Sequence, residues 1–455
     1  MAELCVYTFA PRDHTASFFY RLLAPLRAMS DLGLPIKMFL DTDSNRVTPL
    51  DRVRAFCESD LCLMYQPVGD MPLNNVRQVQ SFIPTKRDGK WKYPPSIVIE
   101  SDDNLFHVSP LNPAFRNLGF RDPSGHEIPL GNHIGLVQNG ERVVRWIDGH
   151  TCDGTCGPNG RGDCNLGINL GANRLAVEGY RKILAACDAL TCSTEEIAQA
   201  YLREVPLRRH KVFPNMVRFD DYEQVDLAAH PNEVRILWQG GQNHYEDWYP
   251  LRKALGNVTR KYPQVHWVIW GALYSWVMNE IPAERYTFKN WAPYQEYKLR
   301  LAMIGHDINL APLSVSPFNV CRSAIKFYES SVLRRPAATL AQNTGPYARE
   351  IIDGDTGLLF DTPEEFEDKL SLLIESELER ISLARNAKDW LSQNRDLMKR
   401  APEIFEYWSM LREEKKLDQP LPSEAEWQEL EQKFNDEQQA AAAEGNGREL
   451  AAVRG

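Results

Sequence analysis

A short segment in the second half of the sequence combines two cations and a carboxylate at helical spacing. A strand is predicted to end near Leu310, and a helix to begin around residues 322–324. Arg322, Lys326 and Glu329 follow at i, i+4 and i+7, which places all three on one helical face. Two cations beside a helix N-terminus suit a pyrophosphate, and a carboxylate one turn deeper can accept both hydroxyls of a ribose. On spacing alone, a solvated stripe of charged residues is the favoured alternative.

A second candidate site is the loop 150–165, which is rich in glycine, asparagine and aspartate. His150, Cys152, Cys156 and Cys164 offer four ligands of the types that hold a structural zinc ion. Their Cys-x3-Cys-x7-Cys spacing departs from the standard zinc knuckles. The alternatives are a local disulfide and an acceptor-binding loop with incidental thiols.

Polar side chains also follow two predicted strands of the N-terminal half. Asp102 and Asp103 come after a fully apolar strand, and Arg12 and His14 come after the first strand of the chain. Because the carboxyl ends of parallel strands meet at one edge of a sheet, we expect these residues to face a cleft. The alternative role of the two aspartates is to cap a turn. No Gly-x-Gly-x-x-Gly follows the first strand, which disfavours a nicotinamide-binding domain.

The elements that must position these residues alternate between short apolar runs and helical patterns. A helix is predicted over Ser17–Met29, with a kink at Pro25, and another begins at Thr362-Pro363. The predicted strands are Leu4–Phe9, Ile36–Leu40, Leu61–Tyr65, Ile97–Ile99 and Ala189–Cys192, then Val234–Trp238, Val265–Trp270, Ile308–Leu310, Ala337–Leu340 and Leu358–Phe360.

This alternation predicts an α/β fold with two parallel sheets facing each other across a cleft. The N-terminal domain is expected over residues 1–220, including the loop 150–165. A polar linker over 221–233 leads to a C-terminal domain over 234–415, and a low-complexity tail follows over 416–455. Ligands of such sheets bind beyond the carboxyl ends of the strands.

Composition narrows the function classes. The 455 residues are 43% hydrophobic and 25% charged, as in globular proteins, and carry no apolar run long enough for a transmembrane helix and no secretory signal. The nine cysteines are odd in number and fit a reducing cytoplasm better than a disulfide scaffold. The net charge of -10 argues against general nucleic-acid binding. A local basic groove remains the alternative, with candidates Arg12, Arg21, Lys86, Arg87, Lys90 and Lys92.

Several ordered segments resemble retaining, GT-B-type glycosyltransferases of the large family-four group, in its phage and bacterial subgroup. The most specific part is the Pro-Phe-Asn…Lys-Phe-x-Glu pattern over 317–329, followed by Gly345-Pro346 and the Asp-Gly-Asp-Thr-Gly-Leu-Leu-Phe segment over 353–360. Residues 186–196, 212–217 and 236–247 resemble the segments where the family passes from its first to its second domain. The resemblance covers roughly residues 4–410 and implies a GT-B fold, with C-terminal helices crossing back to brace the N-terminal domain.

The resemblance also implies roles for particular residues. Glu329 would bind the nucleotide ribose, and Lys326 and Arg322 would lie against the diphosphate, in a donor site that includes Ser323, Gly240, Gly241 and His244. Asp102 and Asp103 resemble an acidic segment on the acceptor side, with Arg12 and His14 beside them. Two departures stand out. Cys321 replaces the first acid of the family's Glu-x7-Glu motif, and Gln242, Asn243 and His244 stand where the family has an Arg…Lys phosphate pair.

These features predict a glycosyltransferase that moves a sugar from a nucleotide-diphosphate sugar, UDP- or GDP-linked, to an acceptor hydroxyl with retention. Lys326, Arg322, His244 and Asp103 are the expected catalytic residues, and no metal is expected at the diphosphate. The acceptor stays open between a glycan, a lipid, a protein and a modified DNA base. The alternatives are a GT-B-type nucleotide-sugar epimerase and a non-catalytic sugar-nucleotide-binding protein. Asp41-Thr42-Asp43 has the form of a metal-binding DxD, and we assign it to a strand-terminal turn.

Overall fold

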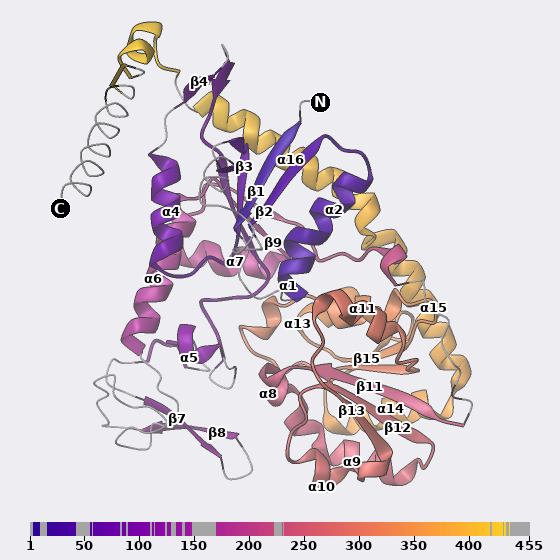
Figure 1. The fold of residues 1–455 in the computed structure, drawn as a ribbon. Coiled ribbons are helices and arrows are strands. Elements are labelled where there is room, and N and C mark those ends of the chain that lie inside the picture. The colour runs from indigo at the N-terminus through magenta and orange to yellow at the C-terminus, as the bar shows by residue number, and fades with distance from the viewer. Residues whose placement is uncertain are drawn as a thin grey trace, which may run out of the picture.

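The computed structural model of the chain contains two α/β units, drawn one above the other in Figure 1. It describes residues 3–9, 16–41, 55–56, 58–81, 84–87, 90–109, 112, 114–122, 125–128, 133–138, 142–147, 170–222, 230, 232–418, 421–430, 432–433 and 436. The helices and strands named below come from these ranges.

The first unit is built on a six-stranded sheet in which every pairing is parallel. Its strand order is β10-β9-β6-β3-β1-β2. The strands are β1 (Leu4–Phe9), β2 (Ile36–Asp41), β3 (Leu61–Tyr65), β6 (Ser96–Ser101), β9 (Ala189–Cys192) and β10 (His210–Val212). The helices are α1 (Ala16–Phe18), α2 (Ala24–Asp31), α4 (Asp70–Gln80), α5 (Phe115–Leu118), α6 (Leu170–Ala186) and α7 (Glu195–Glu204). Two antiparallel pairs, β4 (Thr85–Arg87) with β5 (Lys90–Lys92) and β7 (His133–Gln138) with β8 (Arg142–Ile147), lie apart from the sheet.

The second unit repeats the plan with strand order β13-β12-β11-β14-β15-β16, again parallel throughout. Its strands are β11 (Val234–Gly240), β12 (Val265–Gly271), β13 (Tyr286–Lys289), β14 (Ile308–Ala311), β15 (Ala338–Gln342) and β16 (Leu358–Phe360). Its helices are α8 (Tyr245–Trp248), α9 (Arg252–Lys261), α10 (Val277–Glu280), α11 (Tyr294–Ala302), α12 (Ile325–Ser331), α13 (Gly345–Glu350), α14 (Pro363–Glu375) and α15 (Glu377–Asn394). The predicted α/β fold with two facing parallel sheets is confirmed.

The first helix of the chain is interrupted by a π-helical turn, η1 (Phe19–Leu23), between α1 and α2. Pro25 follows directly in the first turn of α2. Because proline has no N–H, it cannot donate to the carbonyl four residues back, and the register of hydrogen bonds changes just before it. The irregularity expected at Pro25 therefore takes the form of a π turn, which holds the buried side chains of Tyr20 and Arg21.

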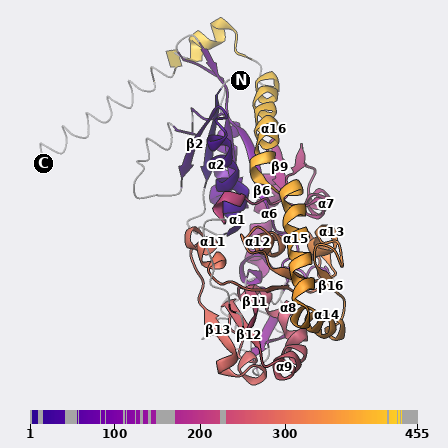
Figure 2. The same cartoon turned by 90° about the vertical axis from the view of Figure 1, so that its right-hand side faces the viewer.

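The last long helix, α16 (Leu397–Asp418), follows the second sheet in sequence but packs on the first unit. Figure 2 shows α15 and α16 running along one side of the molecule from the lower unit to the upper one. Ser96 Oγ donates to the carbonyl of Leu411 at 3.1 Å, and Lys415 Nζ lies 3.0 Å from both carboxylate oxygens of Asp188. The predicted crossing back of the C-terminal helices is thus present.

Among the described helices, none combines the length and the apolar character needed to cross a membrane.

Candidate functional site

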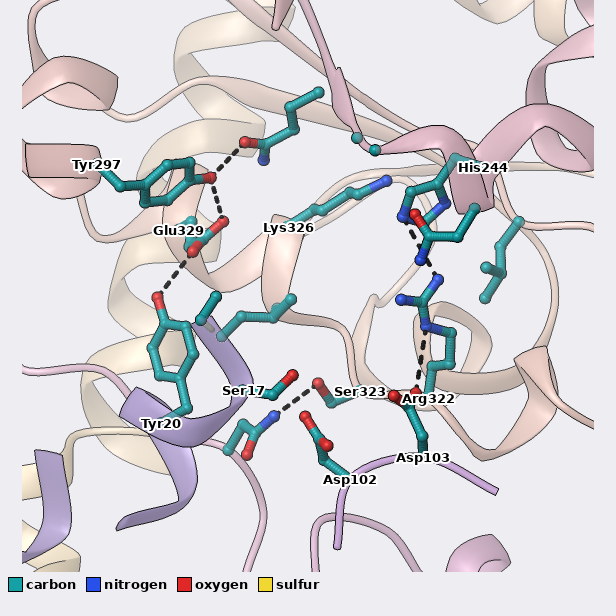
Figure 3. A pocket seen from close by; sticks show the side chains of 18 of the residues that line it. Ser17, Tyr20, Asp102, Asp103, His244, Tyr297, Arg322, Ser323, Lys326 and Glu329 are labelled. Carbon is teal, nitrogen blue, oxygen red and sulfur yellow. Dashed lines mark hydrogen bonds and ion pairs between the residues drawn. The ribbon is translucent and has the colours of Figure 1, made fainter. Parts of the chain in front are cut away.

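A cavity of about 350 Å³ lies where the carboxyl ends of the two sheets meet (Figure 3). Such a volume is within the range of small-molecule sites. It is lined by Ala16, Ser17, Tyr20, Asp102, Asp103, Asn215, Gln239, Gly240, Gly241, Asn243, His244, Trp270, Trp291, Ala292, Tyr297, Leu313, Arg322, Ser323, Ile325, Lys326, Glu329 and Tyr347. Both units contribute, so the cavity is an interdomain site.

Lys326 is a buried cation with no hydrogen-bond partner for its Nζ among the described residues. Its side chain starts in the first turn of α12 and borders the cavity, and the residue is only 8% exposed. Burial, with a smaller contribution from Arg322, lowers the pKa of Lys326 to about 8 against the opposing effect of Asp247. An ammonium group with unused donors at a cavity wall is suited to bind an anion.

Glu329, one turn along α12, directs both carboxylate oxygens toward tyrosines. Tyr20 Oη donates to Oε1 at 2.7 Å, and Tyr297 Oη donates to Oε2 at 2.8 Å (Figure 3). Burial raises the pKa of Glu329 to about 7, although the two tyrosines and Lys326 favour the ionised form. Each carboxylate oxygen has a further lone pair, so Glu329 can still accept two ligand hydroxyls.

His244 forms a buried pair with Asp247, one turn later. Its Nδ1 lies 2.6 Å from Asp247 Oδ2, while Asp247 Oδ1 accepts from Ser314 N and Oγ and from Asn319 Nδ2. Burial and the nearby cations Lys326 and Arg322 lower the pKa of His244 to about 3. The neutral ring must then donate from Nδ1 to the carboxylate, which leaves the Nε2 lone pair beside the cavity, 3.4 Å from Arg322 Nη1.

Arg322 connects the two units. Its Nε lies 3.8 Å from Asp103 Oδ1 across the cleft. The expectation that Arg322 shares a helical face with Lys326 and Glu329 is wrong, because α12 begins only at Ile325 and Arg322 has extended backbone (φ -69°, ψ 169°). Asn319, bonded to Asp247 and Ser314, fixes a separate 3-10 turn, η6 (Asn319–Cys321), ahead of the helix.

The other donor-site and acceptor-side residues predicted in the described part, Ser323, Gly240, Gly241, Asp102 and Asp103, also line the cavity, whereas the groove candidate Arg21 is buried in an ion pair with Glu100. Ser323 Oγ accepts from Asn215 Nδ2 at 2.9 Å, and Tyr65 Oη donates to Asp102 at 2.6 Å. Burial and the neighbouring carboxylate of Asp102 raise the pKa of Asp103 to about 7. Gly240 ends β11 with φ +157°, and a Cβ there would come within 2.7 Å of the His244 ring. Gly240 therefore lets the chain pass close to His244.

Other predicted residues lie outside the described ranges: Arg12 and His14, the candidate zinc ligands His150, Cys152, Cys156 and Cys164, and Thr42-Asp43 of the DxD pattern. Within the ranges that the structure describes, there is no cluster of three or more His, Cys, Asp or Glu side chains suited to a metal ion.

Sequence reasoning missed Tyr297, Gln239 and Asp247, and gave Tyr20 no role. Only Asp247 carried a usable signal, since His-x-x-Asp places the carboxylate one helical turn from the imidazole. Tyr20, Gln239 and Tyr297 come from three distant elements, and local sequence patterns do not show that these elements converge.

Solved structures that resemble this one match it over nearly its whole length at low sequence identity. HepE from Anabaena, in complex with UDP and glucose, has a TM-score of 0.52 at 12% identity and covers 89% of this chain and 99% of its own. Sucrose-phosphate synthase from Thermosynechococcus elongatus has a TM-score of 0.56 at 11% identity and covers 90% of this chain and 99% of its own. A glycosyltransferase from Rickettsia africae has a TM-score of 0.54 at 9% identity and covers 90% of this chain and 98% of its own.

The chain has the GT-B fold. Its cavity lies between the two Rossmann-like units of that fold, at the carboxyl ends of β6 and β11. No protein-family model matches the sequence, and a search of curated proteins gave no match.

Proposed function

We propose that this protein is a glycosyltransferase that uses a nucleoside diphosphate sugar as donor. The observation that carries the proposal is the buried ammonium group of Lys326, which has no hydrogen-bond partner within the described ranges and lies beside Arg322 and one helical turn from Glu329. A diphosphate neutralises two cations, and a ribose diol matches a carboxylate, so one ligand class uses all three groups. HepE, which shares the fold, is described in complex with UDP and with UDP-glucose, and this favours a UDP-sugar over a GDP-sugar.

In this proposal the protein contributes mainly positioning and electrostatic stabilisation. Lys326 and Arg322 stabilise the charge that develops on the departing diphosphate, and they are already in place before the reaction. With Nδ1–H donated to Asp247, the Nε2 of the neutral His244 ring faces Arg322 Nη1 at 3.4 Å and helps to hold that guanidinium at the cavity. Asp103 faces Arg322 from the acceptor side.

We propose that transfer proceeds with retention at the anomeric carbon. The bond from that carbon to the diphosphate oxygen breaks, the acceptor oxygen bonds to the same face, and its proton passes to the departing diphosphate. No side-chain nucleophile is needed. In the domain division that accompanies this proposal, residues 1–220 hold the acceptor, 221–233 link the domains, 234–415 hold the donor and 416–455 form a tail.

A neutral acceptor is favoured over DNA by the charges next to the donor cavity. A second cavity of about 520 Å³ lies between α7 and the turn η6, and Asn104 and Cys321 are part of its wall. The charged residues that line it are Arg121, Arg203, Glu195, Glu196 and Glu204. Binding of a DNA backbone would require an excess of positive charge, and this set of residues has none. Transfer to glycans rather than to duplex DNA is the expected outcome of an acceptor screen.

The donor assignment is tested by thermal shift against UDP, GDP, ADP, CMP and their common sugar conjugates. Glu329→Ala is the site variant, and Glu364→Ala, at an exposed position of α14, is the matched control. We expect a UDP compound to raise Tm in the wild type and in the control, since saturating ligand stabilises by a few kcal/mol at about 100 times Kd. Loss of that shift in Glu329→Ala supports the site, whereas no shift with any nucleotide overturns it.

Turnover separates the transferase from the alternatives. A transferase releases the nucleoside diphosphate and forms a product whose anomeric configuration NMR can assign. Epimerisation of the sugar, or binding with no turnover across a panel of acceptors, would contradict the proposal. An inverted product would leave the donor site in place but overturn retention.

A further inference from the structure

Glu329 is the meeting point of two hydrogen-bond chains. On one side Tyr222 Oη lies 2.9 Å from Tyr20 Oη, which in turn lies 2.7 Å from Glu329 Oε1. On the other side Tyr297 Oη contacts both Gln239 Oε1 and, at 2.8 Å, Glu329 Oε2. These side chains are buried: Tyr20, Tyr222, Gln239 and Glu329 are at most 5% exposed.

The number of protons on each group decides which hydroxyl donates in these hydrogen bonds. A phenol has one proton, and an ionised carboxylate accepts only, so Tyr20 must give its proton to Glu329 and receive one from Tyr222. On the other side Tyr297 Oη donates to Glu329 Oε2 and also contacts the amide oxygen of Gln239.

The two chains come from different parts of the molecule. Tyr297 and Gln239 belong to α11 and β11 of the second unit, whereas Tyr20 belongs to the π turn η1 of the first. Tyr222 follows the 3-10 turn η2 (Phe219–Asp221), where the chain leaves the first unit. Lys298, next to Tyr297, pairs with Asp221 and lies 4.2 Å from the centre of the Phe19 ring. The junction around Glu329 therefore joins both units and the connection between them.

We propose that Tyr20 is a positioning residue of the donor site: the first unit supplies the hydroxyl that holds the Glu329 carboxylate in the orientation that accepts a ribose diol. This inference rests on the proposed function, because it assumes a nucleotide in the cavity. The carboxylate is fixed by one anchor on each oxygen, which leaves one lone pair of each oxygen to the ligand. The ribose end of the site is complete only when the first unit lies against the second.

Tyr20→Phe tests this role, because it removes the hydroxyl and keeps the ring. Tyr180→Phe is the matched control, since Tyr180 is also a buried tyrosine of the first unit and its hydroxyl bonds Tyr201, which is not one of the tyrosines that bond Glu329. We expect UDP to bind Tyr20→Phe about 5- to 20-fold more weakly, because the carboxylate that meets the ribose loses one of its two anchors. Tyr222→Phe should weaken binding by about 2- to 3-fold, because its hydroxyl reaches Glu329 through Tyr20 and does not bond the carboxylate itself.

Two further readouts exclude a merely structural effect. Wild type should prefer UDP over 2′-deoxy-UDP, and Tyr20→Phe should reduce that preference by about threefold or more, because the freed carboxylate no longer meets both hydroxyls. The pH at which UDP affinity is half lost should also move upward. The groups facing Glu329 are Tyr20, Tyr297, Gln239 and Lys326, and removal of one donor disfavours the ionised carboxylate.

The outcomes separate the two hypotheses. Failure of the wild type to bind any nucleoside diphosphate overturns the proposed function itself. If wild type binds UDP but Tyr20→Phe keeps its affinity, its ribose preference and its pH midpoint, the donor site stands and the role of Tyr20 is overturned. An equal loss in Tyr180→Phe would likewise overturn it, since a general loosening of the first unit would then explain the result.

Discussion

Lys326 destabilises the empty protein for the same reason that it is suited to bind an anion. Its ammonium group is buried with no hydrogen-bond partner in the part of the chain that the structure describes, and burial lowers its pKa to about 8. Such a group persists in a fold when a ligand satisfies it. Replacing Lys326 with an uncharged side chain therefore tests whether the residue serves ligand binding at the expense of stability.

Replacement Lys326→Met should stabilise the unliganded protein by about 1–3 kcal/mol and weaken UDP binding by about 10-fold or more. The advantage of the variant should shrink as pH rises from about 8 to above 10, because the native lysine loses its proton before the unfolded one does. Urea denaturation across pH and calorimetric titration measure both effects. Lys182→Met, at an exposed position of α6, is the control and should change neither. A destabilised Lys326→Met would contradict the argument.

Glu329 gives the opposite pH dependence. Burial raises the pKa of this carboxyl to about 7, above its unfolded value, so the native state holds the proton more tightly. The stabilisation this provides is complete below the unfolded pKa and is lost as pH rises toward 7. Relative to Glu329→Gln, which does not titrate, the unliganded wild type should lose on the order of 2 kcal/mol between about pH 4.5 and 7. A constant difference across this range would show that Glu329 is already ionised throughout.

Lys326 and Glu329 were singled out in the sequence by a pattern that resembles a family motif and not by helical periodicity. The helical period alone placed Arg322 on the same face as Lys326 and Glu329, and the structure corrects this: Asn319 is engaged with Asp247, a residue 72 positions earlier, and forms its own turn. Arg322 reaches the cavity from extended backbone instead. Long-range side-chain bonds of this kind leave no periodic trace in a sequence.

At the scale of elements, the end of β11 controls the orientation of His244. Gly240 has φ +157°, and its position faces the imidazole ring at a distance that leaves no space for a methyl group. Gly240→Ala should therefore displace His244 from Asp247, lower stability by about 1–3 kcal/mol and reduce turnover together with UDP affinity.

Gly179→Ala provides the control for that variant. Gly179 lies in α6, and a Cβ there would have no neighbour within 4 Å. Alanine should stabilise the helix by up to about 1 kcal/mol and leave UDP affinity unchanged. Chemical shifts of the His244 ring nitrogens in the two variants would show whether the Nδ1–H tautomer survives. An unchanged His244 signal in Gly240→Ala would contradict the steric argument.

Element boundaries were predictable where local chemistry sets them. Thr362 caps α14 by accepting from Glu365 N, with Pro363 at the first helical position, as the sequence indicated. The π turn η1 and the edge strand β13 were not predicted. The first arises from the hydrogen bond that Pro25 cannot make, and the second lies on a half-exposed edge whose residues lack a fully apolar run.

At the scale of the molecule, α16 makes the first unit depend on chain that follows the second. Trp408 of α16 is fully buried in a core cluster that includes Leu26 and Met29 of α2 and Leu4 of β1. Trp408→Ala should therefore lower the free energy of unfolding by about 3–5 kcal/mol, whereas Met410→Ala, on the exposed side of the same helix, should stay within about 0.5 kcal/mol.

Amide exchange shows which unit α16 stabilises, because it reports loss of protection strand by strand. If α16 braces the first unit, amide exchange in Trp408→Ala should accelerate in β1, β3 and β6 and much less in β11 and β12, although Trp408 is nearer to the second sheet in sequence. UDP binding should fall as well, because Tyr20 belongs to the helix whose continuation, α2, packs against α16. Faster exchange in β11 and β12 alone would contradict this, since the helix would then stabilise the unit from which it emerges.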